Sequence, residues 1–184
     1  MILPIYIYGH PVLRKMCKSI AKDYSDLNEL IENMFATMYN ANGVGLAAPQ
    51  IGKDIRLFVV DASPFAENEP ELEGFKKVFI NAEIIERRGE EWSMEEGCLS
   101  IPRLNAPVSR EEEIVITYRD ENWEERTETF KGYAARIIQH EYDHIEGILF
   151  PDRCNPLRRR LLNSKLAKIQ KGIFKRDYKV VLGK

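Results

Sequence analysis

The sequence predicts an α+β fold organised as a single domain over residues 1–184. Three stretches show the apolar spacing of amphipathic helices, and five others are short runs typical of strands. The chain contains no internal repeat and no linker-like stretch. A length of 184 residues is ordinary for one domain and is enough to bury a substantial core.

The predicted strands are apolar or alternating runs bounded by turn-forming residues. Residues 62–75 are acidic and contain two prolines, so we expect a surface loop there. Trp92 follows the third predicted strand and is expected to pack in the core. The five predicted strands are residues 4–8, 55–60, 77–87, 111–119 and 123–130.

The helices are predicted from apolar periodicity and from capping residues. A first helix is expected to begin after Ser25, a good N-cap residue, and to end at Asn42-Gly43. A second spans residues 132–147 and ends at a glycine, and a third spans 156–171 and opens with a proline. Residues 173–184 form a tail of uncertain structure. The third helix is expected to pack one apolar face made of Leu157, Leu161, Leu162, Leu166 and Ile169.

Composition narrows the setting in which the protein works. No apolar run approaches the ~20 residues that a membrane-spanning helix needs. The N-terminus has no basic region ahead of an apolar core, so no signal peptide is expected. Three widely spaced cysteines argue against a disulfide framework and favour a reducing compartment. We therefore expect a cytoplasmic protein without a membrane partner.

The charge is unevenly distributed along the chain. Residues 156–184 hold ten Lys and Arg residues against one acid, whereas residues 1–155 hold seventeen against twenty-eight. A basic C-terminal region on an acidic body indicates an anionic partner, with no preference for a nucleic-acid sequence. The alternative is a basic face that is merely solvated.

The strongest chemical signal is the stretch His140-Glu141-Tyr142-Asp143-His144, which reads H-E-x-x-H. Positions four apart lie on one face of a helix, so His140 and His144 can present two imidazoles to one metal ion. Glu141 follows the first ligand, where its carboxylate can reach a water on that metal. This arrangement indicates a metal-assisted hydrolase with Glu141 as general base.

Two histidines leave such a site incomplete, because catalytic metal sites commonly carry three protein ligands and a water. After Glu146 the chain contains neither Glu nor His, and its only acids there are two aspartates. Cys98 is the best upstream candidate because a thiolate binds iron or zinc strongly. Cys154 is the alternative. If both cysteines were ligands, the site would be a closed structural one, and Glu141 would have no role.

Two further motifs accompany the H-E-x-x-H stretch. They are GVGLAAPQ at residues 43–50 and EGCLS at residues 96–100, and the third motif reads QHEYDH at residues 139–144. In this order and spacing they resemble the three motifs of peptide deformylases, and the resemblance covers nearly the whole chain. It implies an α+β fold with antiparallel sheets around the helix that carries H-E-x-x-H, plus an N-terminal and a C-terminal helix.

The resemblance implies removal of the formyl group from the N-terminal formylmethionine of nascent bacterial polypeptides. It implies Cys98, His140 and His144 as ligands of Fe²⁺, with Zn²⁺, Ni²⁺ or Co²⁺ able to replace it. Glu141 is then the acid and base, while Gln50 and the backbone N–H of Leu99 stabilise the oxyanion. The residues expected to bind substrate are Val44, Gly45, Gly97, Tyr133, Arg136 and Ile137, with a purely structural role for Arg136 as the alternative.

The basic C-terminal helix adds a partner to this expectation. Nascent chains leave a ribosome whose surface is largely RNA phosphate, so the helix is expected to contact the ribosome electrostatically. Two other functional classes remain open on the residues alone. A zinc protease would need a different third ligand, and a metal-stabilised binding module would use both Cys98 and Cys154 and show no turnover.

Overall fold

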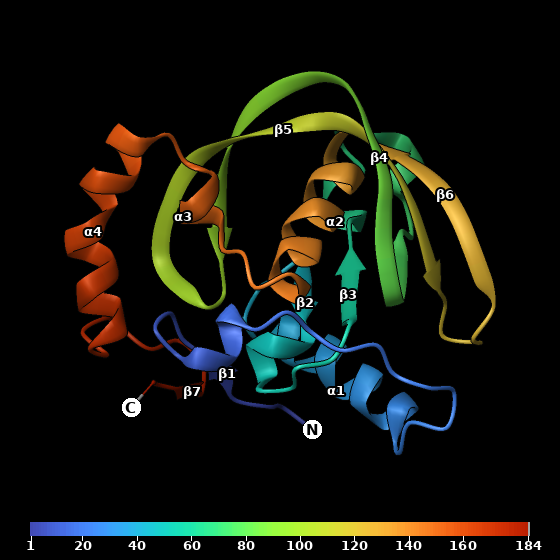
Figure 1. Cartoon of the computed structure of the whole chain (residues 1–184), viewed down its shortest axis with the longest axis horizontal. Coiled ribbons are helices and arrows are strands. Elements are labelled where there is room, and N and C mark those ends of the chain that lie inside the picture. Colours follow the sequence, from blue (N-terminus) through green and yellow to red (C-terminus); the bar gives the residue numbers. More distant parts are fainter. Residues whose placement is uncertain (184) are drawn as a thin grey trace.

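The structure is a computed structural model that describes residues 1–183 (Figure 1). Lys184, the last residue of the predicted domain and tail, lies outside the described residues. Five strands form one antiparallel sheet in the order β2-β3-β4-β5-β6. Figure 1 shows the two longest strands, β4 and β5, arching over helix α2 in the middle of the molecule. The strands are β2 (Gly45–Ala47), β3 (Leu57–Asp61), β4 (Lys76–Cys98), β5 (Ile101–Arg119) and β6 (Glu125–Lys131).

Strands β4 and β5 form a hairpin that extends well beyond the predicted strands 77–87 and 111–119. The residues in between are rich in charges and lack an apolar run, which hid the strands. Four register shifts interrupt the pairing of β4 with β5, and such irregularities let a long hairpin bend. Trp92 lies on this hairpin and is only partly buried, so its prediction as a core residue was wrong. The hairpin turn leaves Cys98 at the very end of β4.

Helix α2 (Gly132–Ile145) occupies the centre of the fold and carries the H-E-x-x-H stretch. It packs against β2, β3, β5 and β6, and most of its side chains are buried, including polar ones. Phe58 and Phe79 stack with ring centroids 4.7 Å apart in the core cluster that includes Ile138 from the helix. Gly147 follows the helix with φ of +74°, the left-handed conformation that favours glycine after a helix. The predicted α+β fold, with the H-E-x-x-H stretch on a central helix, is thus the observed architecture.

Helix α1 (Leu27–Asn40) buries the predicted stripe of apolar side chains against the sheet. Its start differs from the prediction. Asp26, not Ser25, occupies the N-cap position, in a left-handed conformation and without a side-chain capping bond. Ser25 instead donates a 2.7 Å hydrogen bond to the Asp26 carboxylate. A local side-chain bond therefore replaced the expected cap.

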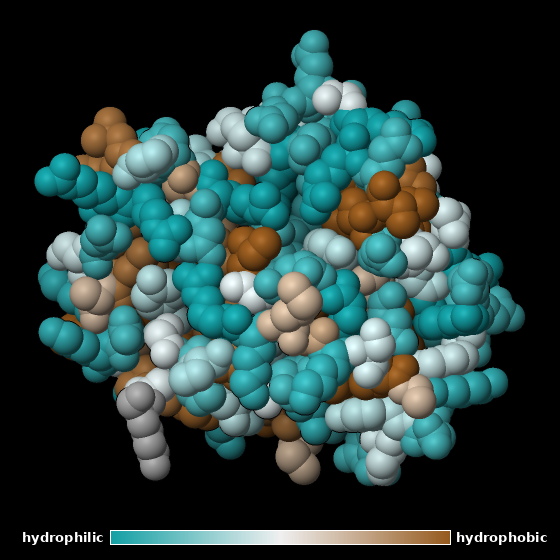
Figure 2. Space-filling view, viewed as in Figure 1, coloured by the Kyte–Doolittle hydropathy of each residue, from teal (hydrophilic) through white to brown (hydrophobic). Residues whose placement is uncertain are grey.

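Helices α3 (Phe150–Arg153) and α4 (Pro156–Gln170) follow α2. Leu162, Leu166 and Ile169 pack α4 onto the body, but Leu157 and Leu161 are 71% and 65% exposed. The expectation that all five share one packed face was therefore wrong. Residue 161 is rotated about 100° from residue 162 around the helix axis, which turns its strip away from the body. Figure 2 shows apolar atoms among hydrophilic ones at the edge where α4 lies in Figure 1.

The two ends of the chain meet in a small parallel sheet of β1 (Ile5–Tyr6) and β7 (Val180–Val181). The predicted strand at residues 4–8 is thus shorter than expected, and the C-terminal tail has a defined course. Within residues 1–183, no helix combines the length and the apolar character needed to cross a membrane. Single 3₁₀ turns complete the fold at Pro11–Arg14, Ala48–Ile51, Ser63–Phe65 and Pro70–Leu72.

Candidate metal centre and catalytic site

Three donor side chains converge where the end of β4 meets α2. Ligand atoms of Cys98, His140 and His144 all lie within 4.8 Å of one another. The Sγ of Cys98 is 3.2 Å from Nε2 of His144. Both histidines lie on one face of α2, one turn apart, as their spacing requires. A thiolate and two imidazoles are a donor set that suits iron or zinc, so the residues present fit a metal ion.

The outer nitrogen of one imidazole is held by a carboxylate. Nδ1 of His140 lies 2.9 Å from Oε2 of Glu96, which leaves Nε2 of His140 free for a metal. Burial lowers the pKa of His140, but hydrogen bonds to Cys98 and Glu96 outweigh it and raise that pKa well above the usual value. Burial, together with the charge of His140, lowers the pKa of His144 well below the usual value. The lowered pKa favours the neutral form of His144, and a metal ion bound here would displace the proton of His140.

Glu96 is the centre of a buried ionic cluster that the sequence did not reveal. Arg110 binds both of its oxygens, at 2.6 Å and 3.0 Å, and Arg136 binds one of them at 2.8 Å. Arg110 also donates to Asp143 at 2.9 Å, one residue before His144. Burial opposes ionisation, but hydrogen bonds from His140 and Arg110 hold the pKa of Glu96 far below its usual range. The sequence signals were its place at the start of the EGCLS motif and its spacing from Cys98, since alternate residues of a strand share one face.

Cys154, the alternative ligand, does not join the three donors. Its Sγ lies 3.7 Å and 3.8 Å from the backbone oxygens of Phe150 and Pro107. Cys17 is buried elsewhere, and burial raises the pKa of its thiol to about 12. A closed site made of two cysteines and two histidines finds no support in this geometry.

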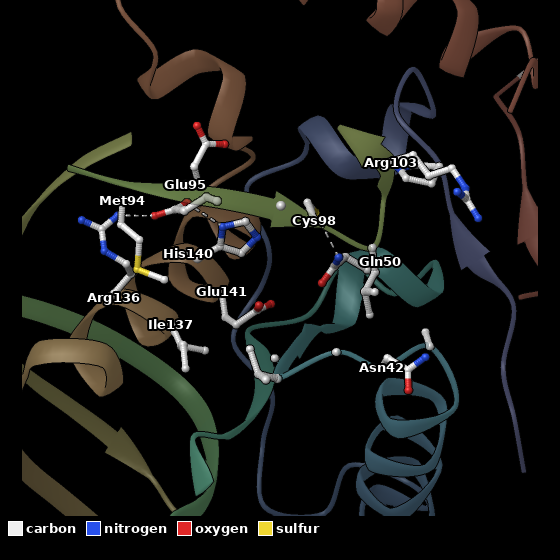
Figure 3. Close-up of a pocket in the computed structure, with 18 of the residues that line it drawn as sticks. Asn42, Gln50, Met94, Glu95, Cys98, Arg103, Arg136, Ile137, His140 and Glu141 are labelled. Atoms are coloured by element: carbon white, nitrogen blue, oxygen red, sulfur yellow. Dashed lines mark hydrogen bonds and ion pairs between the residues drawn. The ribbon is translucent and has the colours of Figure 1, made fainter. Parts of the chain in front are cut away.

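Glu141 points into the same space as His140 and Cys98, as Figure 3 shows. Its carboxylate is buried, and Oε2 has no hydrogen-bond partner. Burial is the main reason why its pKa rises to about 7. Gly45 lies directly against this carboxylate, where a Cβ atom would collide with it. The second glycine of the GVG stretch is thus explained by the close approach of backbone to Glu141.

Gln50 faces the site from the opposite wall (Figure 3). Its Oε1 accepts a 2.8 Å hydrogen bond from the backbone N–H of Ala47, so its amide nitrogen faces Cys98 and Ser100. Nε2 lies 3.4 Å from Sγ of Cys98 and 3.2 Å from Oγ of Ser100. The amide is therefore held in one orientation at the edge of the cavity.

A cavity of about 420 Å³ opens beside these groups. Five of the six predicted substrate residues line it, and so do the predicted catalytic residues Gln50, Leu99 and Glu141. The structure adds residues that the sequence did not single out, because they come from the long hairpin, a surface loop and the tail. These added lining residues include Phe65, Met94, Arg103, Asp177 and Tyr178.

Tyr133 is the predicted substrate residue that does not line the cavity. Its ring stacks on Phe65, with centroids 4.6 Å apart, so it supports the wall from behind. Arg136 does line the cavity, but its guanidinium is also bound to Glu96 and to the backbone oxygen of Val108 at 2.9 Å. It stacks over Trp92 at 4.3 Å. Arg136 thus lies at the wall of the cavity and also links α2 to the hairpin, while substrate binding by it stays a prediction.

The family model described as polypeptide deformylase matches residues 2–160. The chain belongs to the polypeptide deformylase family. The peptide deformylase of Christiangramia forsetii is 57% identical, covering 98% of this chain and 95% of that protein.

Solved structures of deformylases superpose on nearly the whole chain. The peptide deformylase of Thermus thermophilus is 40% identical with a TM-score of 0.82, covering 94% of this chain and 99% of the other. The peptide deformylase of Synechococcus elongatus, solved in complex with actinonin, is 36% identical with a TM-score of 0.78, covering 97% and 91%.

Family membership settles the reaction. A deformylase removes the formyl group from the N-terminus of newly synthesised polypeptides and is a metal-dependent hydrolase of protein biosynthesis. The three motifs therefore predicted the activity correctly. The zinc protease and the metal-stabilised binding module are excluded as functions of this chain. The relatives of this chain that are named peptide deformylase include several from bacteria.

Proposed function

We propose that Cys98, His140 and His144 hold the metal ion and that Glu141 is the acid and base of deformylation. The observation that supports this is the convergence of three donors within 4.8 Å beside a buried, unpartnered carboxylate. A divalent ion held there would supply Lewis acidity, which brings the pKa of a coordinated water toward ~7 and polarises the formyl carbonyl. Glu141→Gln tests this assignment, because the variant should keep the metal and lose nearly all turnover.

Glu141 performs the proton transfers in this proposal. An amide nitrogen leaves only when protonated, so the same carboxylate takes a proton from the attacking water and delivers it to the departing amine. Because burial raises the pKa of Glu141 to about 7, the group can both accept and release a proton near neutral pH. The formyl oxygen becomes negative, and the Gln50 amide and the Leu99 N–H stabilise it, each worth about 3 kcal/mol by comparison with other oxyanion holes.

The pocket fits a methionine side chain. Val44, Ile137 and Met94 provide an apolar wall, and Gly45 and Gly97 leave backbone close to the bound peptide. A site too narrow for a methyl group would favour formyl, which carries only a hydrogen, over acetyl. Turnover of formyl-Met-Ala-Ser compared with acetyl-Met-Ala-Ser tests this selectivity.

We propose Fe²⁺ as the metal in the cell, with Zn²⁺, Ni²⁺ or Co²⁺ able to replace it. The thiolate and imidazole donors suit all of these ions. Metal analysis of protein purified without oxygen tests the assignment, with turnover measured on the same sample. A zinc content equal to the protein concentration, with full activity and no iron, would contradict it.

Ribosome contact through α4 is a separate proposal. Arg158, Arg160, Lys165 and Lys168 are exposed along the helix, next to the exposed Leu157 and Leu161. Arg159 is half-buried and bound to Asp152 at 2.6 Å, so it contributes less free charge. The cations of such a helix would pair with RNA phosphates. Its two exposed leucines would contact an apolar patch beside that RNA. We propose accordingly that residues 1–184 act as one cytoplasmic catalytic domain that works at the ribosome.

Replacing the four exposed cations of α4 by Gln tests the contact. Co-sedimentation with ribosomes at low salt should fall strongly, and wild-type binding should weaken steeply as salt rises. Turnover of a free formyl-tripeptide should not change. The control carries the same number of Gln substitutions at exposed cations off this helix, at Lys18, Lys22, Lys53 and Arg87. Equal loss in both variants, or no loss in the first, contradicts a specific contact through α4.

A further inference from the structure

The C-terminal segment, residues 173–183, is built into the fold beside the catalytic site. The backbone N–H groups of Ile5 and Ile7 donate to the oxygens of Lys179 and Val181, both at 2.9 Å. Tyr178 and its neighbours pack in the same apolar cluster as Cys98 and Leu99. The segment therefore reaches the loop that carries a metal ligand, although nothing in its sequence predicted this.

Tyr178 makes the closest link between this segment and the site. Its hydroxyl donates a 2.6 Å hydrogen bond to the backbone oxygen of Leu99, and Tyr178 itself lines the cavity. Burial, with a contribution from the charge of Cys98, raises the pKa of Tyr178, so the hydroxyl keeps the proton that it donates. The next carbonyl, of Ser100, accepts a 2.8 Å bond from the N–H of Tyr8. Both peptide oxygens that follow Cys98 are thus held from the N- and C-terminal ends of the chain.

The segment is also held at the mouth of the cavity. Asp177 forms a 2.7 Å ion pair with Arg103, and both residues line the cavity. Arg103 adopts φ of +59°, a conformation that is uncommon for a residue with a side chain. Asp177 is the residue before Tyr178, so the pair ties this part of the segment to the hairpin, although a half-exposed pair contributes little to stability.

We infer, building on the oxyanion role proposed for the Leu99 N–H, that Tyr178 is a positioning residue for deformylation. The hydrogen bond from Tyr178 to the Leu99 oxygen restrains the peptide that follows Leu99. The N–H of Leu99, in the preceding peptide, then keeps its direction toward the formyl oxygen as negative charge develops there. An oxyanion donor acts only when it is aligned beforehand, so loss of the restraint lowers kcat and leaves substrate binding intact.

Tyr178→Phe tests this inference in the metal-loaded, full-length enzyme. Loss of one oxyanion donor lowers kcat by roughly 10²–10³. Loss of its restraint alone should cost a part of that, about 5- to 20-fold in kcat for formyl-Met-Ala-Ser, with KM changed less than twofold. Metal content should be unchanged, and exchange of the Leu99 amide proton with solvent should become faster. Tyr6→Phe makes the same change on strand β1 and should alter neither kcat nor the Leu99 exchange rate.

A purely structural role for Tyr178 predicts a different pattern. If kcat and Leu99 exchange in Tyr178→Phe match the wild type, or if Tyr6→Phe reproduces the loss, the inference is overturned. Gln50→Ala separates failure of the positioning role of Tyr178 from failure of the proposed oxyanion site. A large loss of kcat in Gln50→Ala with none in Tyr178→Phe refutes only the positioning role. No loss in either variant refutes both the oxyanion site and the inference.

Discussion

Replacing Glu141 by Gln should abolish turnover and, at the same time, stabilise the metal-free protein. The change keeps the size of the side chain but removes its charge and its ability to accept a proton. Loss of a general base typically lowers the rate by 10²–10⁴. The stability effect follows from burial, because the carboxylate has an oxygen without a hydrogen-bond partner and a pKa of about 7.

The magnitude follows from that pKa. The ordinary value is 4.5, so the folded state holds the proton over a range in which the unfolded state releases it. Each pKa unit corresponds to about 1.4 kcal/mol, which amounts to about 3 kcal/mol for the shift of Glu141. The folded pKa is raised, so the stability is fully present below pH 4.5 and is lost as the pH rises through about 7. The uncharged Gln variant escapes this loss.

Urea unfolding of the chelator-treated wild type and variant at pH 5 to 9 measures the difference. The variant should gain little at pH 5 and up to about 3 kcal/mol by pH 9. Glu83→Gln, at an exposed position on β4, is the control and should show no pH-dependent gain. A stability difference that stays constant from pH 5 to 9 would refute the reasoning from burial. Turnover above about a tenth of the wild-type rate would refute the general-base role.

Two further predictions concern the metal centre. Glu96→Gln should weaken metal binding about 10- to 100-fold, measured by competition with a chelator, because the outer nitrogen of His140 loses its carboxylate. Because the folded state lowers the pKa of Glu96, the ionised carboxylate stabilises the fold above pH 4.5. That stability is lost as the pH falls through the pKa of the folded state. Glu96→Gln should therefore lose less stability than the wild type below pH 4.5. Cys98→Ala should purify without its metal, whereas Cys154→Ala should keep a full complement, measured by elemental analysis. Equal metal loss in the two cysteine variants would contradict a three-ligand site.

The part of the site that lies on one helix was predictable from the sequence. His140 and His144 are four residues apart, and helix geometry alone places such residues on one face. The same helix geometry places Glu141, the residue after His140, where its carboxylate can reach a water on the metal. The amphipathic stripe of α1 was also readable, because apolar periodicity is a local property of the chain. The two other motifs pointed to the family and thereby to Cys98 and Gln50, but spacing alone left Cys154 open as a ligand.

Tertiary structure decided everything that depends on which surfaces are buried together. The bent β4–β5 hairpin brings Cys98 to α2 and places Glu96 where Arg110 and Arg136 can neutralise it, although its charged strands show no apolar run. Only packing could show that Leu161 faces solvent while Leu162 is buried. The course of the C-terminal segment depends on pairing with β1, at the far end of the chain, and this pairing brings Tyr178 to Leu99. Such contacts join residues distant in sequence, so their energies depend on the whole fold and leave no periodic signal.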